Sequence, residues 1–331
     1  MADTLKIGFL GVGSWATICM NSIRQIAGLE LVACYARTEA ARLEFAKAHA
    51  CQAVASEEEL FSLPGLDAVC IMTPNFTHHA QVLRAAEHGL HIFVEKPMAN
   101  TVAECREMVD AAKRAGVVLF TGHNSRRELR FRRMKAMLEG GDLGRLIMAE
   151  INYTSDAALG KQLGGWRYNA EQTPAVALSQ IGIHAIDILH YVLGTTREVQ
   201  AWISNVGADE GIEDVCLARM LMPDNVSAMF LNAYSVPRIR SLSLMGTGGS
   251  VFSDSEKIIQ YQKSGTITRA IIEVEQNNTV LDEFEEFLRC CRGEATPETD
   301  GDAGLAAIAV MQGMLHSSRN AGVLTKIDGA A

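Results

Sequence analysis

The chain has 331 residues, of which 48% are apolar and 21% are charged, and its net charge is −9. At roughly 150 residues per domain this length predicts two domains, and the composition excludes intrinsic disorder and collagen. Because duplex-binding proteins usually present a basic surface, the acidic balance disfavours a nucleic-acid partner. No apolar run reaches the ~18 residues of a membrane helix, so we expect no membrane partner.

The eight cysteines form no C-x-x-C pair, and we expect no signal peptide. They are therefore interpreted as reduced thiols of a cytoplasmic protein rather than as a disulfide framework. His78 and His79 have no companion cluster of ligands, so we expect no metal site.

Up to residue 121, short apolar runs alternate with helical patterns. Strands are predicted at 6–10, 29–35, 52–54, 68–72, 90–94 and 117–121. Helices are predicted at 39–49, 77–88 and 101–116, and Ser56-x-x-Glu59 and Thr101-x-x-Glu104 are capping-box signatures of helix starts. Alternating strands and helices predict a Rossmann-type, doubly wound parallel sheet, which we assign to a dinucleotide-binding domain at 1–122.

The pattern changes after residue 140. Strands that follow one another are predicted at 145–154, 198–206, 215–221, 226–234 and 241–246, and helices at 178–193, 281–292 and 303–321. Consecutive strands are typical of an antiparallel sheet. The sequence therefore predicts a C-terminal α+β domain at 123–331 with a mainly antiparallel open sheet.

A G-x-G-x-x-A pattern at 11–16 follows the first predicted strand and opens a helix. It permits a tight turn, a close approach of backbone to a pyrophosphate, and close packing of the helix. Such a turn can be purely structural, but the βα units behind it favour a dinucleotide-binding loop. The cofactor contacts expected here are Gly11, Gly13, Ser14, Trp15 and Ala16.

The end of the second predicted strand bears on the choice between NAD and NADP. An NAD site usually places an acidic residue there to bind the ribose 2′-hydroxyl. In this chain Ala36 and Arg37 occupy the place, and the first carboxylate is Glu39. Because an arginine can bind a 2′-phosphate, we expect NADP to be preferred, with NAD possible. Alternatively, Arg37 is a solvated residue and the site does not discriminate.

A lysine follows the fifth predicted strand, in the sequence Glu95-Lys96-Pro97. Ligands of open α/β sheets bind at the carboxyl ends of the strands. A lysine at that edge can stabilise a developing alkoxide or move a proton. From position alone, it is more often an exposed charge.

Four motifs together resemble the Gfo/Idh/MocA family of oxidoreductases, the family of glucose–fructose oxidoreductase and inositol dehydrogenase. They are the G-x-G-x-x-A turn, Thr73-Pro74-Asn75 with His78, Glu95-Lys96-Pro97, and Gly182-Ile183-His184-Ala185-Ile186-Asp187. Segments 122–126 and 165–167 resemble the family's interdomain link and substrate loop. The resemblance covers nearly the whole chain.

The resemblance implies roles in both domains. Lys96 is expected beside the nicotinamide and the reacting carbon, and His184 is expected to be the acid/base group. Further implied cofactor contacts are Thr73, Pro74, Asn75, His78, Glu95 and Asn124. Implied substrate contacts are Arg126, Trp166, Arg167, Gln180 and Asp187. The open face of the second sheet is expected to build a homodimer or homotetramer.

One position departs from the family pattern. Many members carry Asp-x-x-x-His, and Gln180 stands here in place of the aspartate. In a regular helix Gln180, His184 and Asp187 would share one face. Glutamine can orient a substrate hydroxyl but has no charge with which to stabilise a protonated His184. The expected catalytic set is Lys96, His184 and Gln180; outside the family context, the histidine would be read as a core residue.

These observations predict an NADP-preferring dehydrogenase or reductase. It would move hydride between the nicotinamide and a secondary alcohol or ketone carbon of a sugar, polyol or related compound. Two alternatives stay open: an NAD-dependent relative that cleaves glycosides, and a non-catalytic NADP-binding sensor or scaffold. Arg37 disfavours the first, and the joint presence of Lys96 and His184 disfavours the second.

Overall fold

The computed structural model describes residues 4–159, 165–209 and 211–327. This described chain folds into two compact units. The first comprises the residues up to Asn124 together with Asn278–Leu305, and the second comprises Ser125–Asn277 together with the residues from Ala306 onward. No helix in the described ranges is long and apolar enough to cross a membrane.

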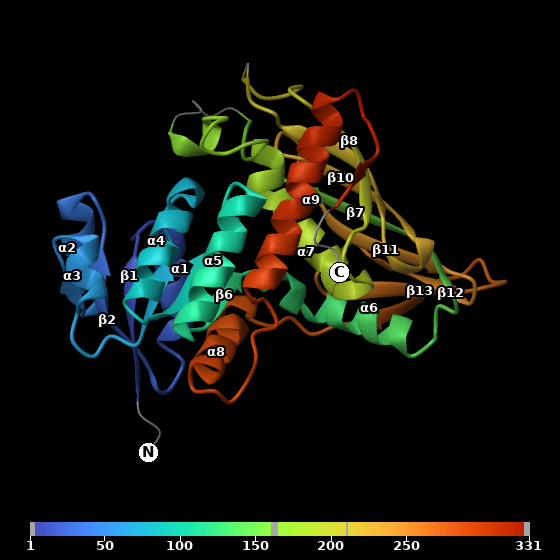
Figure 1. Ribbon diagram of the computed structural model, residues 1–331. Coiled ribbons are helices and arrows are strands. Elements are labelled where there is room, and N and C mark those ends of the chain that lie inside the picture. Colours follow the sequence, from blue (N-terminus) through green and yellow to red (C-terminus); the bar gives the residue numbers. More distant parts are fainter. Residues whose placement is uncertain (1–3, 160–164, 210, 328–331) are drawn as a thin grey trace. The chain divides into compact units, whose positions relative to one another are not determined.

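Among the described residues, the first unit is built on a six-stranded parallel sheet in the order β3-β2-β1-β4-β5-β6 (Figure 1). Its strands are β1 (Leu5–Leu10), β2 (Leu29–Tyr35), β3 (Gln52–Ala53), β4 (Ala68–Ile71), β5 (His91–Glu95) and β6 (Leu119–Gly122). The expected doubly wound sheet is therefore confirmed. Its order reverses between β1 and β4, and ligands of such sheets bind outside the carboxyl strand ends at this point.

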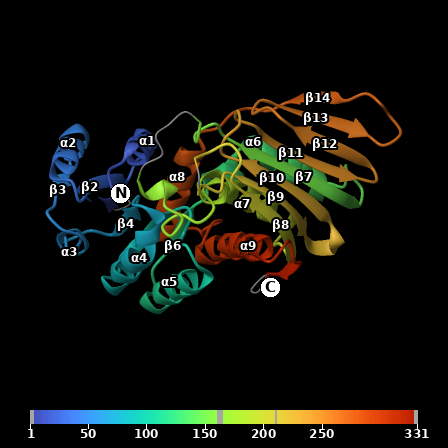
Figure 2. The same cartoon turned by 90° about the horizontal axis from the view of Figure 1, so that it is seen from above.

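Helices cover both faces of this sheet, so its strands are mostly apolar. The helices are α1 (Ser14–Ile23), α2 (Glu39–His49), α3 (Glu57–Phe61), α4 (His78–Glu87), α5 (Val102–Ala115) and α8 (Thr279–Cys291). Figure 2 shows α1 and α8 on one side of the sheet and α4 and α5 on the other. Phe284 of α8 stacks on Phe93 of β5, with ring centroids 4.5 Å apart. A helix from late in the sequence therefore completes this core.

Two signatures of helix N-termini are confirmed. At α5, Thr101 Oγ1 accepts from the Glu104 N–H at 3.2 Å, and the Glu104 carboxylate accepts from the Thr101 N–H at 3.0 Å. At α3, Ser56 Oγ accepts from the Glu59 N–H at 3.0 Å, although Glu59 itself accepts from Ala55. These contacts satisfy N–H groups that the helices leave without intrahelical acceptors.

The described part of the second unit carries a nine-stranded sheet in the order β14-β13-β12-β11-β7-β10-β9-β8-β15. Its strands are β7 (Leu146–Thr154), β8 (Glu198–Ser204), β9 (Val215–Leu221), β10 (Ser227–Ala233), β11 (Arg240–Gly246), β12 (Gly249–Ser253), β13 (Ile258–Lys263), β14 (Ala270–Glu273) and β15 (Thr325–Lys326). Among the neighbouring strands of this described sheet, only β7 and β10 run parallel to each other, and the other pairs are antiparallel. The expected mainly antiparallel sheet is confirmed.

One face of this sheet is packed and the other is open. The helices of the second unit are α6 (Leu129–Glu139), α7 (Ile183–Leu193) and the later part of α9 (Gly301–Arg319). Along β7, Ala149 and Ile151 are fully buried, whereas Met148 and Glu150 are exposed. This alternation is that of a strand with one covered face.

The sequence did not predict β12–β15 or α6. The sequence of β12, Gly-Ser-Val-Phe-Ser, contains residues that favour turns. In α6, charged residues separate Phe131, Met134 and Met137, so its apolar stripe is narrow. In both elements, packing against the rest of the unit prevails over a weak local pattern.

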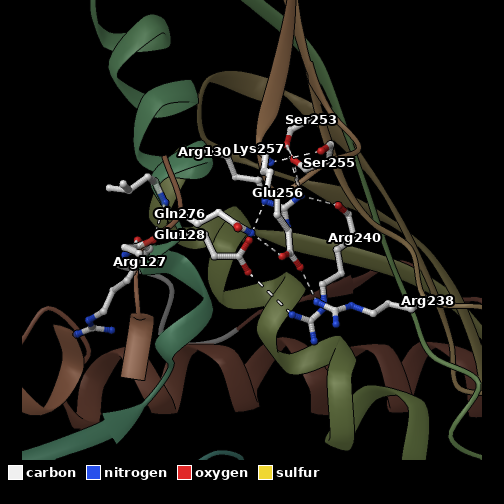
Figure 3. Close-up of polar contacts among 12 residues, drawn as sticks. Arg127, Glu128, Arg130, Arg238, Arg240, Ser253, Ser255, Glu256, Lys257 and Gln276 are labelled. Carbon is white, nitrogen blue, oxygen red and sulfur yellow. Dashed lines mark hydrogen bonds and ion pairs between the residues drawn. The ribbon is translucent and has the colours of Figure 1, made fainter. Parts of the chain in front are cut away.

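A buried arginine ties α6 to the sheet (Figure 3). Arg130 is 1% exposed; its Nε donates to the Glu128 carboxylate at 2.7 Å, and its Nη1 donates to the Arg240 carbonyl at 2.8 Å and the Ser255 carbonyl at 3.3 Å. The guanidinium also lies 4.4 Å from the centroid of the Phe131 ring. One side chain thus joins α6, β11 and the segment after β12.

Arg130→Met should lower the free energy of unfolding by about 3 kcal/mol, because Glu128 and two carbonyl groups lose a buried donor. Arg238→Met is the matched control: Arg238 is 58% exposed and pairs with the half-exposed Glu256 at 2.6 Å, so its loss should cost less than about 1 kcal/mol. Urea unfolding followed by circular dichroism measures both changes. Equal losses would contradict a stabilising role for the buried network.

Candidate active site

The loop between β1 and α1 has the geometry that a dinucleotide requires. Gly11 has φ +97°, and a Cβ added there would lie 2.8 Å from the Met72 carbonyl carbon. Gly13 is the N-cap residue of α1 and has no side chain that could bond the first N–H groups, and a Cβ added there would meet no described atom within 4 Å. Ala16 is fully buried beneath it. Backbone N–H groups at the start of α1 are therefore available to an anion such as a pyrophosphate.

Two arginines lie at the end of β2. Arg37 is exposed. Arg42, in α2, donates from Nη1 to the Ala36 carbonyl at 3.3 Å, and its Nη2 lies 3.7 Å from the Glu39 carboxylate. The sequence analysis missed Arg42, because its proximity to Ala36 arises only when α2 folds back along β2. Both guanidinium groups fit the binding of a phosphate at this strand end.

The expected cofactor residues after β4 hold two loops together. A short 3₁₀ turn, η1 (Asn75–Thr77), leads into α4. The His78 ring nitrogens lie 2.9 Å from the Thr73 carbonyl oxygen and 3.0 Å from the Pro97 carbonyl oxygen. His78 is 1% exposed, and burial lowers its pKa. The loop after β4 is therefore joined to the loop after β5 by a buried imidazole.

The end of β5 carries a buried acid next to Lys96. Trp15 Nε1 donates to Glu95 Oε1, and the Lys96 N–H donates to Glu95 Oε2 at 3.2 Å. Burial raises the pKa of Glu95 to about 7, while the positive charge of Lys96 and the indole N–H oppose this rise. The Lys96–Pro97 peptide bond is cis, and Lys96 is half-buried.

The first unit gathers the expected cofactor residues at one edge of its sheet. Asn124 follows β6 and donates from Nδ2 to Thr279 Oγ1 at 3.0 Å. Asn75, in η1, donates from Nδ2 to Asn100 and is 2% exposed. The expected cofactor residues lie at or after the carboxyl ends of β1, β2, β4, β5 and β6, namely Gly11, Gly13, Ser14, Trp15, Ala16, Arg37, Thr73, Pro74, Asn75, His78, Glu95, Lys96 and Asn124.

In the second unit, the segment before His184 is not a regular helix. Leu178–Gly182 forms a π-helical turn, η4, and α7 begins after it. The helix is therefore not regular over 178–182, so the condition under which Gln180, His184 and Asp187 would share one face is not met. Gly182 lies so close to β10 that an added Cβ would be 2.8 Å from Asn232 Oδ1. Such π-turns are frequent at functional sites.

The expected substrate residues form two separate contacts. Asp187 is 1% exposed and pairs with Arg126, whose Nε donates to Oδ2 at 2.9 Å and whose Nη2 donates to Oδ1. Arg167 Nε donates to Gln180 Oε1 at 3.2 Å, and its guanidinium lies 4.5 Å from the centroid of the Trp166 ring. Asp187 thus forms an ion pair with Arg126, whereas Gln180 is hydrogen-bonded to the segment that begins at Trp166.

Residues that the sequence analysis did not single out lie beside His184. The His184 side chain is mostly buried, and its ring centroid lies 6.4 Å from that of Tyr153. Asn232 donates from Nδ2 to the Tyr153 carbonyl at 2.7 Å. Burial raises the pKa of the Tyr153 hydroxyl. Asn232 could have been found, because it is a polar residue at an inward position of an apolar strand.

Two family models match the chain. The model of the oxidoreductase family with an NAD-binding Rossmann fold matches residues 5–123. The model of the GFO/IDH/MocA C-terminal domain matches residues 131–252. Both halves of the chain therefore match one family, in the order expected from the sequence motifs.

Individual relatives agree with the family models. A 1,5-anhydro-D-fructose reductase of Ensifer adhaerens is 30% identical over 267 residues, which are 78% of this chain and 79% of the reductase. A D-xylose 1-dehydrogenase [NADP(+)] of Haloarcula marismortui is 26% identical over 76% of this chain and 72% of its own. The structure of the aldose-aldose oxidoreductase of Caulobacter crescentus, complexed with glycerol, superposes with a TM-score of 0.87 at 25% identity, over 98% of this chain and 99% of that one. The chain therefore belongs to the Gfo/Idh/MocA family of oxidoreductases, with an NAD(P)-binding Rossmann domain.

Proposed function

We propose that this protein is an NADP-preferring dehydrogenase or reductase that acts on a secondary alcohol or ketone carbon of a sugar, a polyol or a related compound. The observation that carries the proposal is the placement of Lys96 on the same carboxyl edge of the parallel sheet as the open N-terminus of α1. Reductases and dehydrogenases of sugars among the relatives support the substrate class.

The preference for NADP rests on the end of β2. Where an NAD site usually has an acid for the ribose 2′-hydroxyl, this chain has Ala36 followed by Arg37. Arg42 Nη1 donates to the Ala36 carbonyl. Two guanidinium groups suit a 2′-phosphate, because each offers several N–H donors in a planar fork.

Four side chains have separate roles in the proposed reaction, namely Lys96, His184, Gln180 and Arg167. Bound NADP supplies or accepts the hydride at its nicotinamide. Lys96 stabilises the negative charge that develops on the substrate oxygen, and His184 exchanges the hydroxyl proton. Gln180 orients a substrate hydroxyl, and Arg167, which stacks on Trp166, closes the substrate segment.

The absorbance of reduced nicotinamide tests this function. NADP and NAD are supplied in turn with aldoses, inositols, sugar acids and nucleotide sugars, and the reduced cofactors with the matching carbonyl compounds. The proposal predicts a change in absorbance with NADP and a subset of these compounds. Release of free sugar without net change in absorbance would favour glycoside cleavage, and cofactor binding without turnover of any compound would favour a sensor.

We also propose that the open face of the second sheet forms a homodimer or homotetramer. Trp202, Leu217 and Leu231 are cross-strand neighbours on β8, β9 and β10, and the first two are 55% and 45% exposed. An apolar row of this kind is typical of an interface.

All eight cysteines are free thiols, which supports a place in the reducing cytoplasm.

Leu217→Arg should convert the oligomer to monomers, because a charge would be buried at the contact. Leu43→Arg is the matched control, since Leu43 is 53% exposed on α2 of the first unit. Light scattering coupled to gel filtration gives the mass of each variant. A wild-type monomer, or an oligomer that survives Leu217→Arg, would contradict the proposed interface.

A further inference from the structure

A tryptophan of the dinucleotide loop is hydrogen-bonded to a strand end that is not its neighbour in the sheet. Trp15 lies in the first turn of α1, directly after β1, and its Nε1 donates to Glu95 at the end of β5. Strand β4 lies between β1 and β5. The bond therefore links segments that follow or end two strands separated by one other strand, at the carboxyl edge where the dinucleotide is expected.

The acceptor of this bond is held in place on several sides. Glu95 is 7% exposed, and its second carboxylate oxygen accepts from the Lys96 N–H at 3.2 Å. Gly122 of β6 is the cross-strand partner of Glu95, and a Cβ added at Gly122 would lie 3.0 Å from Glu95 Oε1. The carboxyl group is thus confined between the indole of Trp15, the Lys96 backbone and the β6 backbone.

Two thiols interact electrostatically with Glu95, namely Cys19 of α1 and Cys70 of β4. The carboxyl group of Glu283, on α8, interacts with the same two thiols. Burial raises the pKa of both thiols, so neither thiol ionises near neutral pH. The positive charge of Lys96 lowers the pKa of Glu95. Glu283 is fully buried and provides a matched control for the carboxyl group of Glu95.

We propose that Glu95 is a positioning residue whose carboxylate fixes the indole of Trp15 and thereby holds the dinucleotide loop and Lys96 in register across β4. Burial raises the pKa of Glu95 to about 7, so its charge changes within the physiological range. The ionised form is the stronger acceptor for the indole N–H. Protonation weakens that bond and loosens the loop, so we expect weaker cofactor binding below neutral pH.

Intrinsic fluorescence tests the contact without cofactor or substrate. Emission from Trp15 is obtained as the difference between wild type and Trp15→Phe, between about pH 5 and pH 9. We expect a transition near pH 7 that Glu95→Gln abolishes and Glu283→Gln retains. Trp202→Phe, the same change on β8 of the second unit, should also retain it. A signal from Trp15 that does not change with pH, or a transition that persists in Glu95→Gln, would overturn the proposal.

Cofactor affinity tests the consequence. The dissociation constant of NADPH is measured at several pH values for wild type, Glu95→Gln and Trp15→Phe, with thermal melts to confirm folding. We expect the constant of wild type to rise several-fold more on acidification than that of Glu95→Gln, while titration of the phosphate is common to both. Trp15→Phe removes the bond that protonation of Glu95 would weaken, so this variant should show the same reduced pH dependence as Glu95→Gln. Equal pH dependence in all three proteins would refute the positioning role.

The inference rests on the proposed function only for its effect on cofactor affinity. The fluorescence transition needs neither NADP preference nor a sugar substrate. A protein with the transition but without turnover would keep the positioning role and reject the enzymatic proposal. A protein with turnover but without the transition would keep the enzymatic proposal and reject the positioning role.

Discussion

Lys96→Met is expected to lower the turnover number by ~100-fold or more and to change the dissociation constant of NADPH by less than about threefold. Methionine keeps most of the length of the side chain but has no charge to offset negative charge on the substrate oxygen. The dinucleotide is expected to bind mainly through the backbone at the start of α1, which the change does not touch. Stopped-flow absorbance and fluorescence titration measure the two quantities separately.

Lys113→Met is the matched control for this change. Lys113 lies on α5 of the same unit, is 65% exposed and pairs with Asp302 at 3.0 Å. Its replacement should leave turnover within about twofold of wild type, because exposed pairs contribute little. Near-normal turnover in Lys96→Met would reject the role of Lys96. An equal loss in both variants would point to a general effect of removing positive charge.

The double variant Arg37→Ser, Arg42→Ser should raise the dissociation constant of NADP by ~30- to 100-fold. Each lost hydrogen bond to a charged phosphate is worth about 1.5–3 kcal/mol when fully formed, and exposure of Arg37 reduces its share. The constant for NAD should change by less than about threefold, since NAD has no 2′-phosphate to lose contact with. Fluorescence titration with both reduced cofactors gives the ratio.

Arg114→Ser, an exposed arginine near the end of α5, is the control for the double variant and should leave both constants unchanged. If the double variant weakens the binding of NAD as much as that of NADP, the two arginines support the loop and do not discriminate between the two cofactors. If neither constant changes, the end of β2 does not select the cofactor.

Local patterns predicted the cofactor half of this molecule well. The glycine pattern, the capping box at Thr101 and the alternation of strands and helices each depend on residues close in sequence. The bond from Trp15 to Glu95 joins residues 80 positions apart, and no local pattern indicates it. The packing of α8 with the first unit likewise depends on contacts with Phe93 and Phe120 of distant strands.

The second unit was harder to predict. The apolar spacing around Gln180 is typical of a regular helix, and the π-turn of η4 became visible only in the structure, where Gly182 approaches Asn232. The pairing of Arg126 with Asp187 could not be predicted, because the two residues are 61 positions apart and each also fitted a substrate contact. Tertiary contacts decide both arrangements.

Isotope transfer tests the central claim most directly. NADPH carrying deuterium at the transferred position of C4 is supplied with a carbonyl compound that the absorbance panel identifies, and the product is analysed by NMR and mass spectrometry. Direct hydride transfer predicts one deuterium on the new carbinol carbon of the product and none in solvent, at a rate that Lys96→Met lowers. Label that stays in the cofactor or passes to solvent while product forms would contradict the proposed reaction.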